Sequence, residues 1–251
     1  MNPLTGTVIL TCFLVFCRIG GCLMLMPGVG GRNLPPQVRL FLGLAVALAF
    51  VPATYGLVAP QVEGASPARL LVMIAGEVGT GALIGLLARV YILALETLAS
   101  FMAQAVGLAA MPGLSVEDNA PLPTLATLFT FAAVALIFMA DQHLELVRGL
   151  FDSYRRVPPG ALFGARPALV DLVDQLTAAF LLALRIASPF ILYSILVNFA
   201  VGLINKFTPQ IPVFFIAGPF VTAGGLLLLY ASVEPLLSGF LLAFSQWLRN
   251  G

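Results

Sequence analysis

The sequence has few charged residues. Asp, Glu, Lys and Arg together make up 9% of its 251 residues, whereas soluble domains contain roughly 25%. So little charge cannot cover the surface of a water-soluble globule, and the 60% apolar content and the mean hydropathy of +1.05 agree with this. The net charge is only +1, and no basic cluster interleaved with aromatic residues points to a nucleic-acid partner. The composition therefore predicts a membrane protein.

Residues that bind metals or act as nucleophiles are also scarce. His143 is the only histidine, which excludes an HExxH zinc site, and neither a G-x-S-x-G nucleophile motif nor a Gly-rich phosphate loop is present. Cys12, Cys17 and Cys22 are five residues apart, so each is rotated by about 140° from the last on a helix and they cannot share one face. We expect buried free thiols, a packed His143, and no catalytic residue, metal or cofactor.

The apolar residues gather in six segments, about the number of spans of roughly 20 residues that a chain of this length can form. No basic residues precede the first segment and Arg18 interrupts it, unlike a cleaved signal peptide, so we expect this helix to remain in the mature protein. The predicted fold class is all-α: a membrane-protein bundle of about six long apolar helices with a C-terminal helical hairpin. The segments cover residues 4–26, 40–59, 70–95, 125–140, 176–204 and 213–248.

A short polar stretch joins the last two apolar segments. Pro209 and Pro212 each remove a backbone donor and disfavour helical geometry in the residue before them. One helix should therefore end near Phe207 and the next begin near Pro212. Asn205 and Lys206 make this tip polar, which predicts a hairpin of two apolar helices with a polar cap.

Glu77 is an acidic residue within the third apolar segment. It precedes Gly81-x-x-x-Gly85, a small-residue groove that lets another helix approach closely. A carboxylate in the membrane costs about 2.5 to 3.5 kcal/mol on insertion scales, so Glu77 should be paired or should face a polar cavity. A buried ion pair is favoured over a proton relay, because a relay needs a chain of titratable groups. The available basic partners are Arg18, Arg89 and Arg185.

Residues 141–156, DQHLELVRGLFDSYRR, form the clearest amphipathic pattern in the chain. Pro158, Pro159 and Gly160 should end this helix, and Arg166-Pro167 is expected to open a second polar connection. The predicted apolar stripe is Val147, Leu150, Phe151 and Tyr154, and the predicted charged face is Glu145, Arg148, Asp152 and Arg155.

Residues 107–123, GLAAMPGLSVEDNAPLP, interrupt the apolar pattern between two helical segments. Backbone groups without partners cost several kcal/mol each in hydrocarbon, so irregular chain is tolerated only where protein buries it or where it lines a water-filled cavity. A plain surface connector and a loop inside a channel both remain open from the residues alone.

The run Asn205 to Phe214, NKFTPQIPVF, followed by Gly218-Pro219, resembles the hairpin of the FliR family of export-gate subunits of flagella and type III secretion injectisomes. The resemblance covers nearly the whole chain. Pro212 departs from it, because an Asn is frequent there, and so does Phe220-Val221, where a Lys usually follows the Gly-Pro; these differences concern the contacts of the hairpin tip. The other matching residues are Arg18 with Pro27, residues 35–39, Glu77-Val78-Gly79 with Gly81 and Gly85, His143, and Arg185 with Pro189.

The resemblance implies a non-enzymatic, integral subunit of the bacterial flagellar type III protein export gate, in the inner (cytoplasmic) membrane at the flagellar basal body. It implies that residues 1–167 are similar to FliP-like subunits and residues 168–251 to FliQ-like subunits. The implied partners are FliP-like and FliQ-like gate subunits, FlhB, FlhA, membrane lipid and, as substrates, unfolded flagellar proteins. No nucleic acid is among them.

The resemblance also implies two sites. The first is a loop that plugs the channel, with Gly107, Met111, Pro112, Gly113 and Leu114. The second is the hairpin tip as a contact surface for neighbouring subunits, with Asn205, Lys206, Pro209, Gln210 and Pro212. The residues leave one alternative function, an ion-coupled small-molecule transporter, because broken helices and a buried Glu77 suit a binding site at the bilayer midplane. Such a transporter would predict two related halves, and we find no convincing internal repeat.

Overall fold

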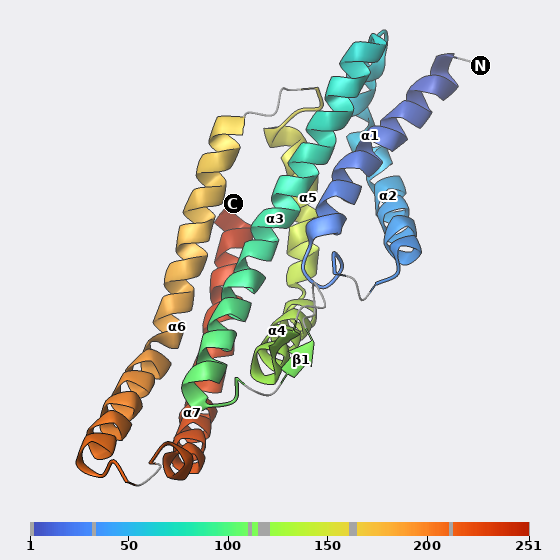
Figure 1. The fold of residues 1–251 in the computed structure, drawn as a ribbon. Coiled ribbons are helices and arrows are strands. Elements are labelled where there is room, and N and C mark those ends of the chain that lie inside the picture. The colour runs from blue at the N-terminus through green and yellow to red at the C-terminus, as the bar shows by residue number, and fades with distance from the viewer. Residues whose placement is uncertain are drawn as a thin grey trace. The chain divides into compact units, whose positions relative to one another are not determined.

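The computed structural model describes residues 3–31, 34–109, 112–114, 121–160, 165–210 and 213–250. In this part of the chain it contains seven helices and one pair of short antiparallel strands (Figure 1). The elements are α1 (Pro3–Leu25), α2 (Pro36–Val62), α3 (Pro67–Val106), β1 (Pro112–Leu114), β2 (Pro121–Pro123), α4 (Thr124–Met139), α5 (Gln142–Arg156), α6 (Ala165–Phe207) and α7 (Val213–Asn250).

The chain divides into two compact units. The first comprises Met1–Val90, Phe138–Leu176 and Trp247–Gly251, and the second comprises Tyr91–Ile137 and Thr177–Gln246. Helices α3, α4, α6 and α7 each contribute residues to both units. The predicted division at residue 167 is of another kind, because it concerns similarity to FliP-like and FliQ-like subunits. It stays a prediction.

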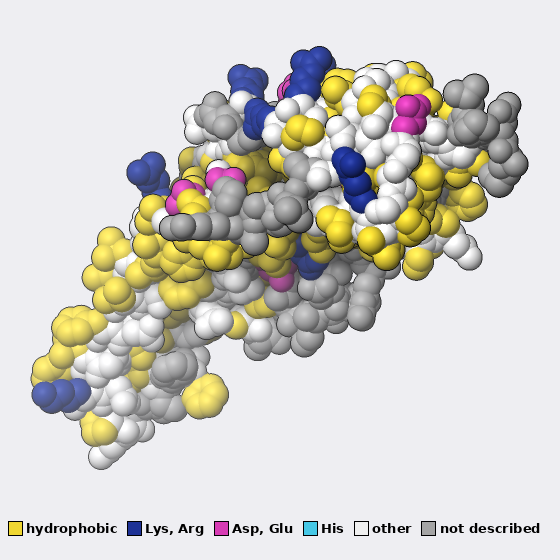
Figure 2. All heavy atoms as spheres, turned by 90° about the horizontal axis from the view of Figure 1, so that it is seen from above, with side chains coloured by type: hydrophobic (Ala, Val, Ile, Leu, Met, Phe, Trp, Pro, Cys, Tyr) yellow, Lys and Arg dark blue, Asp and Glu magenta, His cyan; other side chains and the backbone are white. Residues whose placement is uncertain are grey.

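The helices confirm the predicted fold class, a membrane-protein helical bundle. Five of them are long and apolar enough to cross a membrane, or six when the bent pair α4 and α5 is taken as one span. Apolar side chains cover much of the face drawn in Figure 2. Three helices are far longer than one crossing needs: α3, α6 and α7 have 40, 43 and 38 residues. At about 1.5 Å per residue each is close to twice the roughly 30 Å of a hydrocarbon core.

The ends of the C-terminal helices show how proline places helix boundaries. Helix α6 ends at Phe207 and α7 begins at Val213, as the two prolines between them predict. The expectation of a polar connection at Arg166-Pro167 was wrong, because α6 already begins at Ala165. Proline is tolerated in the first turn of a helix, where its missing N–H has no partner to lose.

Helix α5 has the predicted amphipathic character, but its buried side is rotated slightly from the predicted stripe. Leu150 and Tyr154 are buried as expected, whereas Val147 and Phe151 are only half-buried. Leu146 and Ser153 complete the buried face. Ser153 thus occupies a core position, where its hydroxyl is hydrogen-bonded to the Leu150 carbonyl and to Arg18.

In the first unit, α1 packs against α2, and α2 also contacts α5. The rings of Phe50 on α2 and Phe151 on α5 meet edge to face with centroids 5.5 Å apart. Leu14, Val15 and Ile19 of α1 are almost completely buried. In the second unit, Tyr91 of α3 meets Phe244 of α7 edge to face with centroids 5.8 Å apart. Each unit therefore has an apolar core of its own.

Candidate functional site

Glu77 on α3 forms a two-pronged ion pair with Arg18 on α1. Arg18 Nε donates to Glu77 Oε2 at 2.6 Å and Arg18 Nη2 donates to Glu77 Oε1 at 2.8 Å. Both side chains are buried, with 1% of Arg18 and 3% of Glu77 exposed. A bidentate arginine–carboxylate pair satisfies both carboxylate oxygens, which is what allows a charged pair to remain inside an apolar bundle.

Helix α5 supplies the remaining partners of the Arg18 guanidinium. Nη1 donates to Ser153 Oγ at 3.1 Å, and Nη2 donates to the backbone oxygen of Val157 at 3.0 Å. The guanidinium carbon also lies 4.0 Å from the centroid of the Tyr154 ring, a cation–π contact. We call Arg18, Glu77, Ser153, Tyr154 and Val157 the Arg18 cluster. It ties α1, α3 and the end of α5 together.

Glycines on the facing surfaces of α1 and α3 make this cluster possible. A Cβ on Gly21 would lie 2.7 Å from the carbonyl oxygen of Val78, and one on Gly81 would overlap the carbonyl oxygen of Arg18. A Cβ on Gly85 would collide with the carbonyl oxygen of Cys22. The two backbones therefore approach closely at three successive levels, as small residues permit in membrane helices.

The other basic residues proposed as partners of Glu77 lie elsewhere. Arg185 was expected to be buried, but it is exposed on α6 in the single chain. Most of the residues in the apolar stretch of α6 are not buried. Arg89 is half-buried on α3. Arg18 is the arginine that the fold brings to Glu77, although 59 residues separate the two in the sequence.

The Arg18 cluster connects helices through one ion pair and its hydrogen bonds. Both oxygens of Glu77 accept hydrogen bonds from Arg18 and the side chain is buried, so the carboxylate is held within the ion pair. Among the described residues, no group of three or more His, Cys, Asp and Glu side chains is placed to bind a metal ion. The ring of His143 packs against Phe138 with centroids 5.0 Å apart.

Sequence reasoning missed the contribution of α5 to this cluster. The signal was Ser153, a polar residue between Leu150 and Tyr154 on the apolar side of the predicted helix. A polar side chain at such a position needs hydrogen-bond partners: the Ser153 hydroxyl donates to the Leu150 carbonyl at 2.6 Å and accepts from Arg18 Nη1. The carbonyl of Val157 carries no signal in the sequence.

The hairpin tip is the second candidate site. Asn205, Lys206, Pro209 and Gln210 are all exposed, and Thr208 closes the last turn of α6 with a backbone bond to Ile204 at 2.9 Å. Pro212 lies outside the described residues. The polar groups of the tip thus face outward, available to another molecule.

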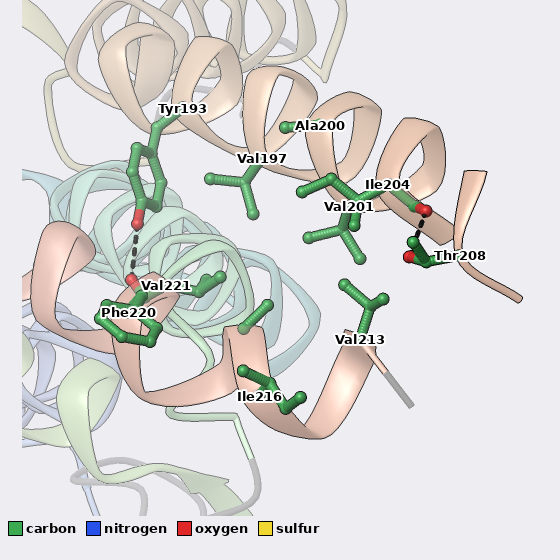
Figure 3. A pocket seen from close by; sticks show the side chains of 11 residues that line it. Tyr193, Val197, Ala200, Val201, Ile204, Thr208, Val213, Ile216, Phe220 and Val221 are labelled. Carbon is green, nitrogen blue, oxygen red and sulfur yellow. Dashed lines mark hydrogen bonds between the residues drawn. The ribbon is translucent and has the colours of Figure 1, made fainter. Parts of the chain in front are cut away.

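An open apolar groove of about 590 Å³ runs between α6 and α7 behind this tip (Figure 3). Side chains from the two helices point toward one another across it. At one end Tyr193 Oη donates to the backbone oxygen of Val221 at 2.5 Å. The lining residues are Tyr193, Val197, Ala200, Val201, Ile204, Thr208, Val213, Ile216, Ala217, Phe220 and Val221.

The chain between α3 and α4 is the third candidate site. Gly107 follows α3 with a φ of 82°, a left-handed conformation that glycine adopts without strain. Pro112, Gly113 and Leu114 form β1, which pairs with β2 so that Gly113 lies opposite Leu122. Met111 lies outside the described residues. The expected irregular segment therefore contains one short antiparallel pair.

Comparison with known proteins connects these features. The family model described as "Bacterial export proteins, family 1" matches residues 9–247. The chain belongs to this family. The match begins within α1 and ends within α7, so the resemblance expected from the sequence is confirmed over nearly the whole chain.

Curated members of the family are similar to the chain along most of their length. The flagellar biosynthetic protein FliR of Caulobacter vibrioides is 27% identical, with 94% of this chain and 92% of that protein covered. The Yop proteins translocation protein T of Yersinia pestis is 32% identical, with 88% and 85% covered. The Escherichia coli FliR is 25% identical, with 89% and 84% covered. The family therefore includes proteins named for flagellar biosynthesis and for the translocation of Yop proteins.

Proposed function

We propose that this protein is an integral subunit of the flagellar type III protein export gate in the bacterial cytoplasmic membrane. The family match over residues 9–247 carries the proposal. It is supported by helices that are close to twice the length of one membrane crossing and keep many apolar side chains exposed, including Phe199, Phe207 and Phe215. Such surfaces suit burial among similar helices. FliP-like and FliQ-like subunits, FlhB and FlhA are the proposed neighbours, and unfolded flagellar proteins are the proposed substrates.

The transporter alternative loses its main support in the geometry of Glu77. An ion-coupled transporter needs a buried acid that can bind and release an ion. In this chain both carboxylate oxygens accept from one arginine, and that arginine is itself bound to α5. Glu77 is a structural residue in the function that we propose.

Co-purification tests the proposal. A tagged copy of the chain, expressed at its normal level and extracted in mild detergent, should isolate FliP-like and FliQ-like subunits in one stable complex. Deletion of the gene should abolish flagellar filaments without affecting growth. Isolation of the chain alone, with normal filaments in the deletion strain, would exclude a place in the flagellar gate.

We also propose that the chain from Gly107 to β2 closes the channel at rest. A movable seal must be displaced at low cost. Three of the six residues in β1 and β2, namely Pro112, Pro121 and Pro123, have no backbone N–H to donate, and a two-stranded pair is at best marginally stable alone. Gly107 ends α3 in a left-handed conformation, in which glycine lets the chain turn away from the helix without strain.

Deletion of residues 111–115 tests the seal. The complex should still assemble, because the helices are untouched, but it should leak ions and small molecules or fail to export. Gly113→Pro should stiffen the same segment and impair export. Dye efflux from vesicles and secretion of filament protein measure the two effects. An assembled deletion variant with a tight membrane and a normal export rate would make the segment a plain connector.

A further inference from the structure

The turn Val221–Gly225 of α7 forms a side-chain hydrogen bond with α6, the other helix of the hairpin. Tyr193 of α6 donates its hydroxyl hydrogen to the carbonyl of Val221 at 2.5 Å (Figure 3). A Cβ on Gly224 would lie 2.8 Å from that hydroxyl oxygen. Glycine at position 224 therefore leaves the space through which the phenol reaches the α7 backbone.

A neighbouring face of the same turn receives the end of α3. Val106, the last residue of α3, is fully buried, and a Cβ on Gly225 would lie 2.7 Å from its Cγ1. The next residue, Gly107, has a φ of 82°, and a Cβ there would lie 3.2 Å from Thr222 Oγ1. The two adjacent glycines of α7 thus accommodate α6 through Tyr193 and α3 through Val106.

We infer that Tyr193 is a positioning residue for the end of α3: its hydrogen bond holds the Val221–Gly225 turn of α7 against α6, and that turn packs against Val106 and Gly107. Gly107 is also the joint from which the chain leaves α3. Movement of the hairpin helices against each other is therefore transmitted to this joint. The importance of the link for export rests on the proposed seal, whereas the link itself rests only on these contacts.

Two backbone hydrogen bonds report on the joint. The amide of Gly107 donates to Gln104 O at 3.1 Å, and the amide of Leu108 donates to Ala103 O at 2.8 Å. Both bonds must break if the chain after Val106 swings away from α3. Their opening is measurable as amide hydrogen exchange, which does not depend on export.

Tyr193→Phe tests the link, because it removes one hydroxyl and keeps the ring. A single hydrogen bond contributes about 1 kcal/mol, so we expect exchange at Gly107 and Leu108 to become roughly three- to tenfold faster in the complex purified in detergent. Exchange in the buried part of α3, around Ile92 and Ala99, should be unchanged. Tyr230→Phe is the matched control, since Tyr230 on α7 is 86% exposed.

Each outcome of the exchange experiment supports or overturns the inference about Tyr193. Unchanged exchange at Gly107 and Leu108 would overturn the inference, and so would an equal increase along the whole of α3, which is the mark of a general loss of stability. Gly224→Ala crowds the same hydroxyl from the α7 side and should accelerate the same two amides. In the double variant with Tyr193→Phe, the two effects should not add, because both act through one contact.

Export assays on the same variants separate this inference from the proposed seal. Faster exchange at Gly107 with normal export and a tight membrane would support the link and count against the seal. Unchanged exchange together with impaired export would refute the link and leave the seal in place.

Discussion

Polar residues are buried and hydrogen-bonded to one another at the Arg18 cluster, whereas they are exposed at the hairpin tip. Around Arg18, a buried ion pair, a serine and a backbone carbonyl satisfy one another inside the first unit. At the tip, Asn205 and Lys206 are exposed, and the groove behind them is apolar and open. In the most apolar stretch of α1, 44% of the residues are buried, against 11% in that of α7. The polar groups of the Arg18 cluster find their partners within one chain. The hairpin tip and the groove leave polar and apolar surface uncovered, which a site of assembly requires.

Breaking the Arg18–Glu77 pair should have the largest effect. Glu77→Gln keeps the size of the side chain but leaves the guanidinium buried without a countercharge, which typically costs about 3 to 5 kcal/mol. The complex should therefore lose subunits at a lower temperature in detergent, as thermal shift and native gels would show. The matched control is Glu145→Gln, which removes the exposed partner of Arg148 and should cost at most about 1 kcal/mol.

The double variant Arg18→Met with Glu77→Leu sharpens this test. Removal of both charges of a buried pair is often much less damaging than removal of one. If Glu77→Gln were as stable as the parent, the pair would not contribute to the first unit, and the contrast with the tip would disappear.

Closing the glycine contact beside the cluster should have a smaller effect. A methyl group on Gly81 would overlap the carbonyl of Arg18, so Gly81→Ala must push α1 from α3, at a typical cost of about 1 to 3 kcal/mol. Gly79→Ala on the same helix meets nothing within 4 Å and should be neutral or stabilising by up to about 1 kcal/mol. Equal melting temperatures for the two variants would show that the packing of α1 on α3 does not depend on the close contact at Gly81.

Reversing the charge at the tip should have the smallest effect on the chain and a large effect on its assembly. Lys206 is exposed, so Lys206→Glu should leave the free energy of unfolding of the isolated chain within about 0.5 kcal/mol of the parent. Export and co-purification of neighbouring subunits should fall, whereas Lys206→Arg should retain both. Normal motility and co-purification in Lys206→Glu would remove the tip from the contact surface.

The sequence allowed the helices to be predicted better than their contacts. Pro209 and Pro212 placed the ends of α6 and α7 because proline acts on the backbone directly around it. The predicted apolar segment began at Leu176, whereas α6 begins at Ala165, because Asp171 and Asp174 interrupt the apolar run but lie exposed on the helix. The seal and the tip contacts stay predictions, because they concern contacts with other subunits and not contacts within this chain.

By itself the sequence determined that this is an apolar, all-helical membrane protein of one export family, and that Glu77 needs a partner. The apolar, helical character and the need of Glu77 for a partner follow from composition and from residues adjacent in the chain. The family follows from the resemblance of motifs spread along the chain and from the family match over residues 9–247. Only the tertiary structure decided that the partner is Arg18, and that Ser153 joins it from 135 residues away. The physical reason is that partner choice depends on which faces of the helices meet. The Gly81-x-x-x-Gly85 pattern predicts a groove that another helix can approach, but only the fold shows that the helix in this groove is α1.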